Sequence, residues 1–232
     1  MAEAVAGIAE PVVVDVVSDV VCPWCYVGRA RLGEAIRSRP DLSVTLRWRP
    51  FQLDPTLPPE GRDRHAYMMG KFGSAERILD MHRQISQIGQ ELGISFDFDA
   101  IKVSPNTLDA HRVIRWSATA GPGVQDRLVG RLFALYFEEG ANIGDHAVLI
   151  DAARDAGMDA ALVETLLATE ADRPEVQQEI ATAQKMGVTG VPCFLLEGRY
   201  AVMGAQEPAA LADAISKVAE AKANGTLDAP QR

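Results

Sequence analysis

Two cysteines separated by two residues, in the segment Cys22-Pro23-Trp24-Cys25, constrain this chain more than any other feature. They directly follow the apolar residues 12–21 and open a stretch with a helical pattern. Far downstream, Val191-Pro192 begins a second strand-like run. Two cysteines at this spacing in the first turn of a helix can close an intramolecular disulfide, and the helix end stabilises a thiolate there. The spacing therefore predicts a redox-active dithiol where a strand meets a helix.

The cysteine count favours chemistry over a structural framework. The 232 residues contain three cysteines, and the third, Cys193, has no obvious partner. A chain of this length does not need disulfides to hold its core, so the pair at 22 and 25 is expected to be catalytic or metal-binding. Half of a zinc site is a weaker interpretation, because no second CxxC or His pair stands at ligand spacing. Two inert buried thiols are the other alternative.

Charge and hydropathy exclude several classes of protein. Against 23 Lys and Arg stand 32 Asp and Glu, and the net charge of −9 argues against a surface for nucleic acid or anionic membrane. No apolar run approaches the ~20 residues that a membrane span needs. Residues 1–11 contain no Lys or Arg and no long apolar core, which makes a poor secretory signal. We expect a cytoplasmic protein.

The order of predicted elements indicates a mixed α/β fold. Residues 12–17 are almost continuously β-branched, as in a strand buried on both faces, and residues 43–49 alternate as in a half-buried strand. Apolar residues then recur at helical spacing through a long middle block. Residues 193–197 and 199–203 read as a hairpin, and Pro208 opens a last helix. The prediction is a thioredoxin-like core (β-α-β … α-β-β-α) with a large inserted all-helical domain. The core is assigned to residues 1–60 and 171–232, and the insertion to residues 61–170.

Helix geometry assigns different roles to the two thiols. Cys22 is expected at the helix N-terminus, where unpaired backbone N–H groups favour negative charge. Cys25 lies one turn further in and is expected to be more buried, so Cys22 attacks and Cys25 resolves a mixed disulfide. Asp15 is the polar exception among the valines and could accept the proton of Cys25. Alternatively, Asp15 faces solvent at a sheet edge or pairs with a base such as Arg47.

The proline at the start of the late strand is a second candidate part of the site. After Gly187 and Gly190, a cis Val191-Pro192 bond is plausible, and it would turn the backbone of Val191 towards Cys22 to pair with a substrate segment. An ordinary trans proline at an edge strand is the alternative. Cys193 is interpreted as a core thiol; a third metal thiolate and a partner in an off-path disulfide stay open. A hydrogen-bonded buried histidine is the preferred reading of His111.

Taken together, these motifs resemble the thioredoxin-fold oxidoreductases of the DsbA family, specifically the FrnE-like subgroup. The resemblance runs from about residue 12 to residue 216 and is carried by the dithiol with its flanks, by Gly190-Val191-Pro192, and by three further stretches: residues 48–55, residues 106–112 and residues 204–206. Two positions depart from the pattern. Cys193 stands where an aromatic residue is usual, and Asp15 lies one residue further from the nucleophile than the acidic residue of thioredoxin and DsbA.

The resemblance implies exchange of disulfides with protein or small-thiol substrates, with Cys22 as nucleophile and Cys25 resolving. Pro23, Trp24, Val191 and a cis Pro192 would contact the substrate. No metal and no resident cofactor are expected, although glutathione or another thiol could serve as redox partner. Two alternatives stay open: a glutathione-dependent isomerase or transferase of the kappa or 2-hydroxychromene-2-carboxylate isomerase type, and a non-enzymatic soft-metal or redox-sensing module.

Overall fold

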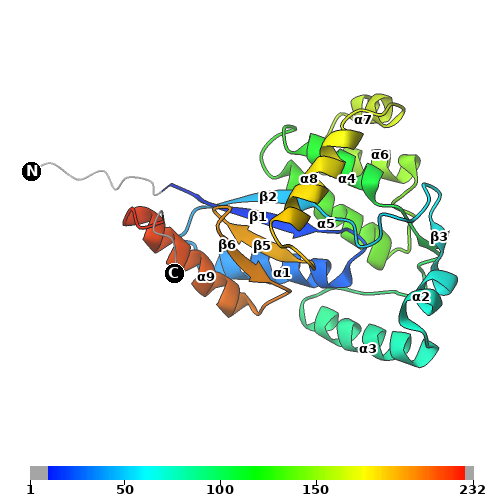
Figure 1. Ribbon diagram of the computed structural model, residues 1–232, viewed down its shortest axis with the longest axis horizontal. Coiled ribbons are helices and arrows are strands. Elements are labelled where there is room, and N and C mark those ends of the chain that lie inside the picture. The colour runs from blue at the N-terminus through cyan, green and yellow to red at the C-terminus, as the bar shows by residue number, and fades with distance from the viewer. Residues whose placement is uncertain (1–9, 228–232) are drawn as a thin grey trace, which may run out of the picture.

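A mixed sheet of four strands, in the order β2-β1-β5-β6, forms the centre of the described chain (Figure 1). The structure is a computed structural model that describes residues 10–227. Strands β1 (Val12–Ser18) and β2 (Val44–Pro50) run parallel. Strands β5 (Cys193–Leu196) and β6 (Tyr200–Met203) form the predicted hairpin, and β5 pairs antiparallel with β1. Most of residues 1–11, interpreted above as a poor secretory signal, and both outer ends of the predicted core lie outside the described residues.

The crossover helix α1 (Pro23–Ser38) joins the two parallel strands and carries the dithiol at its start. Such a crossover is required, because parallel neighbours cannot be joined by a tight turn. Helix α9 (Pro208–Ala223) packs beside α1, and α8 (Arg173–Lys185) contacts β2. In Figure 1, α1 and α9 lie on one side of the sheet and α8 on the other. The strand leading to the dithiol is therefore covered on both faces.

The segment between β2 and α8 is mainly helical. It contains α2 (Arg64–Phe72), α3 (Ala75–Glu91), α4 (Leu108–Ser117), α5 (Val124–Phe137), α6 (His146–Ala156) and α7 (Ala160–Leu167). The predicted all-helical character needs one correction. The short strands β3 (Arg62–Asp63) and β4 (Val103–Ser104) pair antiparallel. The ladder joins the start of α2 to the segment before α4, and a two-residue strand is too short to leave an alternating pattern in the sequence.

Local signals in the sequence set several helix ends. The Asp159 carboxylate accepts hydrogen bonds from the N–H groups of Ala161 and Leu162, and so caps α7. Gly157 follows α6 with φ 94°, a conformation that favours glycine. Helix α9 begins at Pro208, which suits the first turn because proline has no N–H to satisfy.

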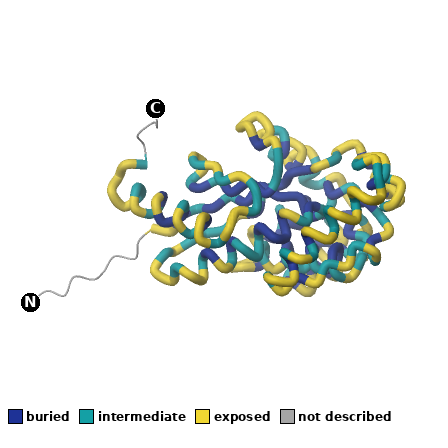
Figure 2. The backbone as a smooth tube through the Cα atoms, turned by 90° about the horizontal axis from the view of Figure 1, so that it is seen from below, coloured by how far each residue is buried: buried dark blue, intermediate teal, exposed yellow. Residues whose placement is uncertain are grey.

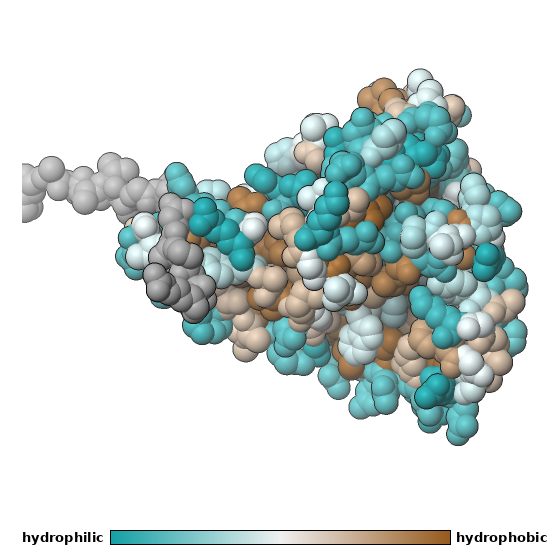
Figure 3. Space-filling model, in the orientation of Figure 1, coloured by the Kyte–Doolittle hydropathy of each residue, from teal (hydrophilic) through white to brown (hydrophobic). Residues whose placement is uncertain are grey.

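One continuous apolar core connects the sheet with the helical segment. Buried residues of this core come from β1, α1, α4, α5, α6 and β5, and include Val14, Leu32, Phe133, Leu149 and Phe194. The buried part of the backbone accordingly runs through the middle of the molecule (Figure 2), while hydrophilic residues cover much of the face seen in Figure 3. The predicted α/β class, with a thioredoxin-like sheet and a helical insertion, is confirmed.

Candidate active site

The dithiol lies where β1 gives way to α1. Cys22 is the residue just before the helix, with extended backbone angles, and Pro23 occupies the first turn. The Cys22 carbonyl accepts hydrogen bonds from Cys25 N at 3.0 Å and Tyr26 N at 3.3 Å. Cys22 N in turn donates to Asp19 O at 3.0 Å. Backbone hydrogen bonds on both sides therefore fix the nucleophile candidate at the helix start.

Both cysteines are free thiols, and they differ in surroundings. The exposed fraction of Cys22 is 5%, and that of Cys25 is 1%. Burial raises the pKa of the Cys25 thiol well above its ordinary value, and the neighbouring Cys22 raises it further. The Ser18 side chain and the Asp19 backbone act in the opposite direction. The raised pKa therefore favours the neutral, protonated form of the Cys25 thiol.

Val191 and Pro192 lie beside the dithiol. The Cys22 thiol donates a hydrogen bond to the Val191 carbonyl over 3.7 Å, and the Val191–Pro192 peptide bond is cis, as predicted. Gly204 N donates to Pro192 O at 2.8 Å, which ties this peptide to the end of β6. On its other side Pro192 faces Gly28 of α1, where an added Cβ would lie 2.8 Å from Pro192 Cγ. Helix α1 and this proline therefore meet in direct contact.

Cys193 lies in the interior and is fully buried. It packs in a small cluster with Val17, Phe51, Ala183 and Val188. Desolvation raises the pKa of its thiol. These surroundings match the preferred interpretation of Cys193 as a core thiol.

The Asp15 carboxylate is half-buried and forms an ion pair. Its Oδ1 accepts a hydrogen bond from Nε of Arg49 at 2.7 Å. The sequence suggested Arg47 as a pairing base; Arg47 is instead the residue directly opposite Asp15 on β2. The structure thus brings Cys22, Cys25, Val191 and Pro192 together and gives Asp15 a partner of its own.

Sequence reasoning missed a buried carboxylate next to the dithiol. Asp19 is 1% exposed, and its Oδ2 accepts a hydrogen bond from Leu53 N at 2.8 Å. Its Oδ1 lies 3.4 Å from Nε2 of His111, and that nitrogen is 2.8 Å from Phe51 O. His111 is the buried, hydrogen-bonded histidine that was predicted. In the sequence, Asp19 is marked only by its position as a single acidic residue between Ser18 and two valines, three residues before Cys22.

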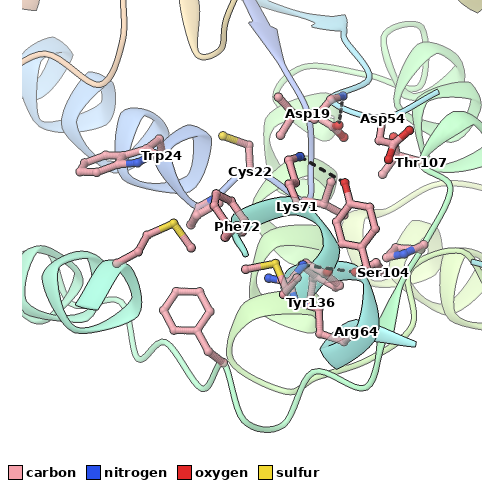
Figure 4. Close-up of a pocket in the computed structure, with 18 of the residues that line it drawn as sticks. Asp19, Cys22, Trp24, Asp54, Arg64, Lys71, Phe72, Ser104, Thr107 and Tyr136 are labelled. Atoms are coloured by element: carbon pink, nitrogen blue, oxygen red, sulfur yellow. Dashed lines mark hydrogen bonds between the residues drawn. The ribbon is translucent and has the colours of Figure 1, made fainter. Parts of the chain in front are cut away.

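A cavity of about 370 Å³ opens beside Cys22 (Figure 4). Its walls come from the start of α1, the loop after β2, helices α2 and α3, and Tyr136 of α5. Its lining residues include Cys22, Trp24, Asp54, Arg64, Lys71 and Phe72. Val191, whose carbonyl accepts the hydrogen bond from the Cys22 thiol, also lines the cavity.

Comparison with known proteins agrees with this geometry. Residues 13–216 match the DSBA-like thioredoxin domain family. The chain belongs to this family. A probable DsbA oxidoreductase from Streptomyces coelicolor superposes with a TM-score of 0.81, at 26% identity, over 95% of this chain and 93% of that chain. The match and the Cys22–Cys25 pair place the chain in the DsbA-like thiol–disulfide oxidoreductase family.

Two more distant structures share the fold alone. A 2-hydroxychromene-2-carboxylate isomerase superposes with a TM-score of 0.67, at 19% identity, over 91% of this chain and 98% of that chain. The cytosolic disulfide reductase DsbM from Pseudomonas aeruginosa, with glutathione, superposes with a TM-score of 0.57, at 18% identity, over 93% of this chain and 100% of that chain. Within residues 10–227, no helix is long and apolar enough to cross a membrane.

Proposed function

We propose that this protein exchanges disulfides with its substrates through Cys22 as the nucleophile and Cys25 as the resolving thiol. The observation that carries the proposal is the position of the Cys22 sulfur, at the start of α1, facing the Val191 carbonyl and a cavity. Unpaired N–H groups at a helix start favour a negatively charged sulfur. Cys25 follows one turn later, shielded from solvent, as suits a thiol that acts only on the adjacent sulfur.

The reaction proceeds in two exchanges. The Cys22 thiolate attacks one sulfur of a substrate disulfide, forms a mixed disulfide and releases the other half as a thiolate. The Cys25 sulfur, after losing its proton, attacks Cys22 and releases the second half. Two electrons pass from the dithiol to the substrate, and the reverse sequence oxidises a substrate dithiol. Pro23, Trp24, Val191 and Pro192 border the nucleophile and are proposed to contact the substrate.

Finer assignments rest on the sequence motifs. We place the chain in the FrnE-like subgroup and in the cytoplasm, with residues 61–170 as an inserted domain. Protein and small-molecule thiols, glutathione among them, are the proposed partners. The DsbM structure that shares this fold holds glutathione, which makes a small thiol a reasonable partner to test here.

A glutathione-dependent isomerase is the second candidate, because an isomerase shares the fold. In such an enzyme Cys22 or Ser18 would hold the glutathione thiol and Cys25 would be dispensable. A metal-binding module has less support. In the part of the chain that the structure describes, no three His, Cys, Asp or Glu side chains gather as metal ligands.

The test uses reduced protein with insulin and with glutathione disulfide as substrates. We expect Cys22→Ser to abolish exchange, and Cys25→Ser to accumulate a mixed disulfide on Cys22 visible by mass spectrometry. Cys193→Ala is the matched control, a third cysteine removed away from the cavity, and should retain activity. Undiminished exchange in Cys22→Ser would refute the proposal. Full glutathione-dependent isomerisation by Cys25→Ser would favour the second candidate.

A further inference from the structure

Two positively charged side chains line the cavity on the face of α2. Arg64 and Lys71 are seven residues apart, two turns of helix, and so project from the same side of α2. Figure 4 draws both around the space that Cys22 borders. A ligand that reaches the Cys22 sulfur through this cavity would therefore pass close to both cations.

Both cations bond only to neutral groups in residues 10–227. Lys71 Nζ donates to the Tyr67 hydroxyl at 3.1 Å, and Arg64 Nη1 makes a long contact of 3.4 Å with Ser104 Oγ. The Arg64 guanidinium also lies 6.0 Å from the centre of the Tyr136 ring. Neither lies within ion-pair distance of a described carboxylate, although the hydrogen bonds from Thr56 and Tyr67 and, after them, the Lys71 charge help to lower the pKa of Asp54. Both therefore retain N–H donors that a charged ligand can use.

Two carboxylates, Asp54 and Asp19, lie in the same walls, and each accepts hydrogen bonds from fixed donors. Asp54 accepts hydrogen bonds from the backbone and the hydroxyl of Thr56, at 3.0 and 2.5 Å. Asp19 is buried; its Oδ2 accepts from Leu53 N, whereas its Oδ1 has no hydrogen-bond partner among the described residues. Selection for an anion would therefore depend on directed hydrogen bonds from the two cations rather than on a net positive charge.

The remaining walls suit a short apolar chain. Trp24 and Phe72 are among the apolar residues that line the space. A volume of about 370 Å³ lies at the lower end of small-molecule sites, which span roughly 300–1,000 Å³. Only 5% of Cys22 is exposed, so a slender ligand reaches its sulfur more readily than a folded protein surface does.

We propose that this cavity selects low-molecular-weight disulfides and thiols that carry a carboxylate, with Lys71 and Arg64 as the residues that recognise the charge. The inference rests on the proposed exchange chemistry and names its substrate class. One half of the disulfide forms the mixed disulfide with Cys22 while its carboxylate accepts hydrogen bonds from α2. The other half leaves as a thiolate, and Cys25 then releases the bound half. The reduced dithiol supplies both electrons.

The experiment compares three disulfides of nearly equal length that differ in terminal charge. They are 3,3′-dithiodipropionate (dianion), hydroxyethyl disulfide (neutral) and cystamine (dication). Reduced protein is mixed with each in single-turnover experiments, quenched with acid and analysed by mass spectrometry. Each rate is divided by that of dithiothreitol with the same disulfide, which removes differences in intrinsic reactivity.

The variants are Lys71→Gln and Arg64→Gln. A hydrogen bond to a charged group is worth about 1.5–3 kcal/mol, so we expect each variant to lower the corrected rate with the dianion by about tenfold or more. The rate with the neutral disulfide should change less than about twofold. Arg77→Gln is the control, because it removes the same charge from exposed α3, outside the cavity lining, and should leave both rates unchanged.

The outcomes separate this inference from the proposed function. If the variants slow the dianion and the neutral disulfide equally, or if wild-type protein shows no preference for the dianion, the inference is wrong while exchange through Cys22 stands. Reduction of insulin with no reaction of the small disulfides would also overturn it. Failure of wild-type protein with every disulfide, insulin included, would instead remove the proposed function.

Discussion

A methyl group added at Gly28 should press on the contact between α1 and Pro192. The new Cβ would lie 2.8 Å from Pro192 Cγ and 3.3 Å from Phe194 Cζ, and Phe194 is fully buried and cannot easily move away. Alanine gains about 1 kcal/mol over glycine within a helix, but overpacking a well-packed core costs about 1–3 kcal/mol. We expect Gly28→Ala to lower the free energy of unfolding by up to about 2 kcal/mol.

The same change should slow thiol exchange. If Pro192 moves outward to relieve the contact, the Val191 carbonyl moves with it, away from the Cys22 thiol that now bonds to it over 3.7 Å. The measurements are urea unfolding and the single-turnover rate with hydroxyethyl disulfide.

Gly33→Ala in the same helix is the matched control for this prediction. A Cβ there meets only the Arg37 guanidinium end at 3.3 Å, which can swing away, so this variant should be up to about 1 kcal/mol more stable than wild type. The reasoning is refuted if Gly28→Ala is as stable as Gly33→Ala and exchanges disulfides at the wild-type rate.

Three further predictions concern the Cys25 thiol and the carboxylates of Asp19 and Asp15. Because burial raises the pKa of Cys25, its thiolate fraction grows about tenfold for each pH unit below that pKa. A mixed disulfide on Cys22 should therefore decay about tenfold faster per pH unit, measured by alkylation and mass spectrometry; a flat profile would contradict this. Asp19→Ala should lower the free energy of unfolding by about 1–3 kcal/mol in urea, since it leaves the Leu53 N–H unpaired. Asp15→Ala removes a partly exposed ion pair worth only about 0–1 kcal/mol. Asp15→Asn should slow decay of the mixed disulfide if Asp15 accepts the Cys25 proton, and an unchanged rate would end that prediction.

Local patterns were sufficient to predict the central elements. The β-branched run before Cys22 became β1, and its alternating counterpart became β2, which begins one residue later than predicted. The hairpin and the helix starting at Pro208 also follow from turn residues and periodicity. These features depend on neighbours in the sequence, so the sequence alone carries them.

Contacts between distant segments could not be predicted in the same way. The partner of Asp15 is Arg49, two residues beyond the residue opposite it on β2, because the choice depends on how both side chains extend across the sheet. The bond between Asp19 and Leu53 depends on the path of the loop after β2. Residues 64–72 fell within the predicted helical insertion, but no individual helix was assigned there, so the cavity wall that carries Lys71 was missed.

The cavity described above joins two parts of the chain that are separate in the sequence. The Cys22 sulfur comes from the start of α1, whereas the two cations that line the same cavity come from α2, on the far side of a complete strand and loop. Substitutions confined to α2 could therefore change which small molecules the protein accepts as substrates, without altering the thiol–disulfide exchange itself. Ancestral or engineered versions of this scaffold could differ in substrate specificity while keeping the same Cys22–Cys25 dithiol.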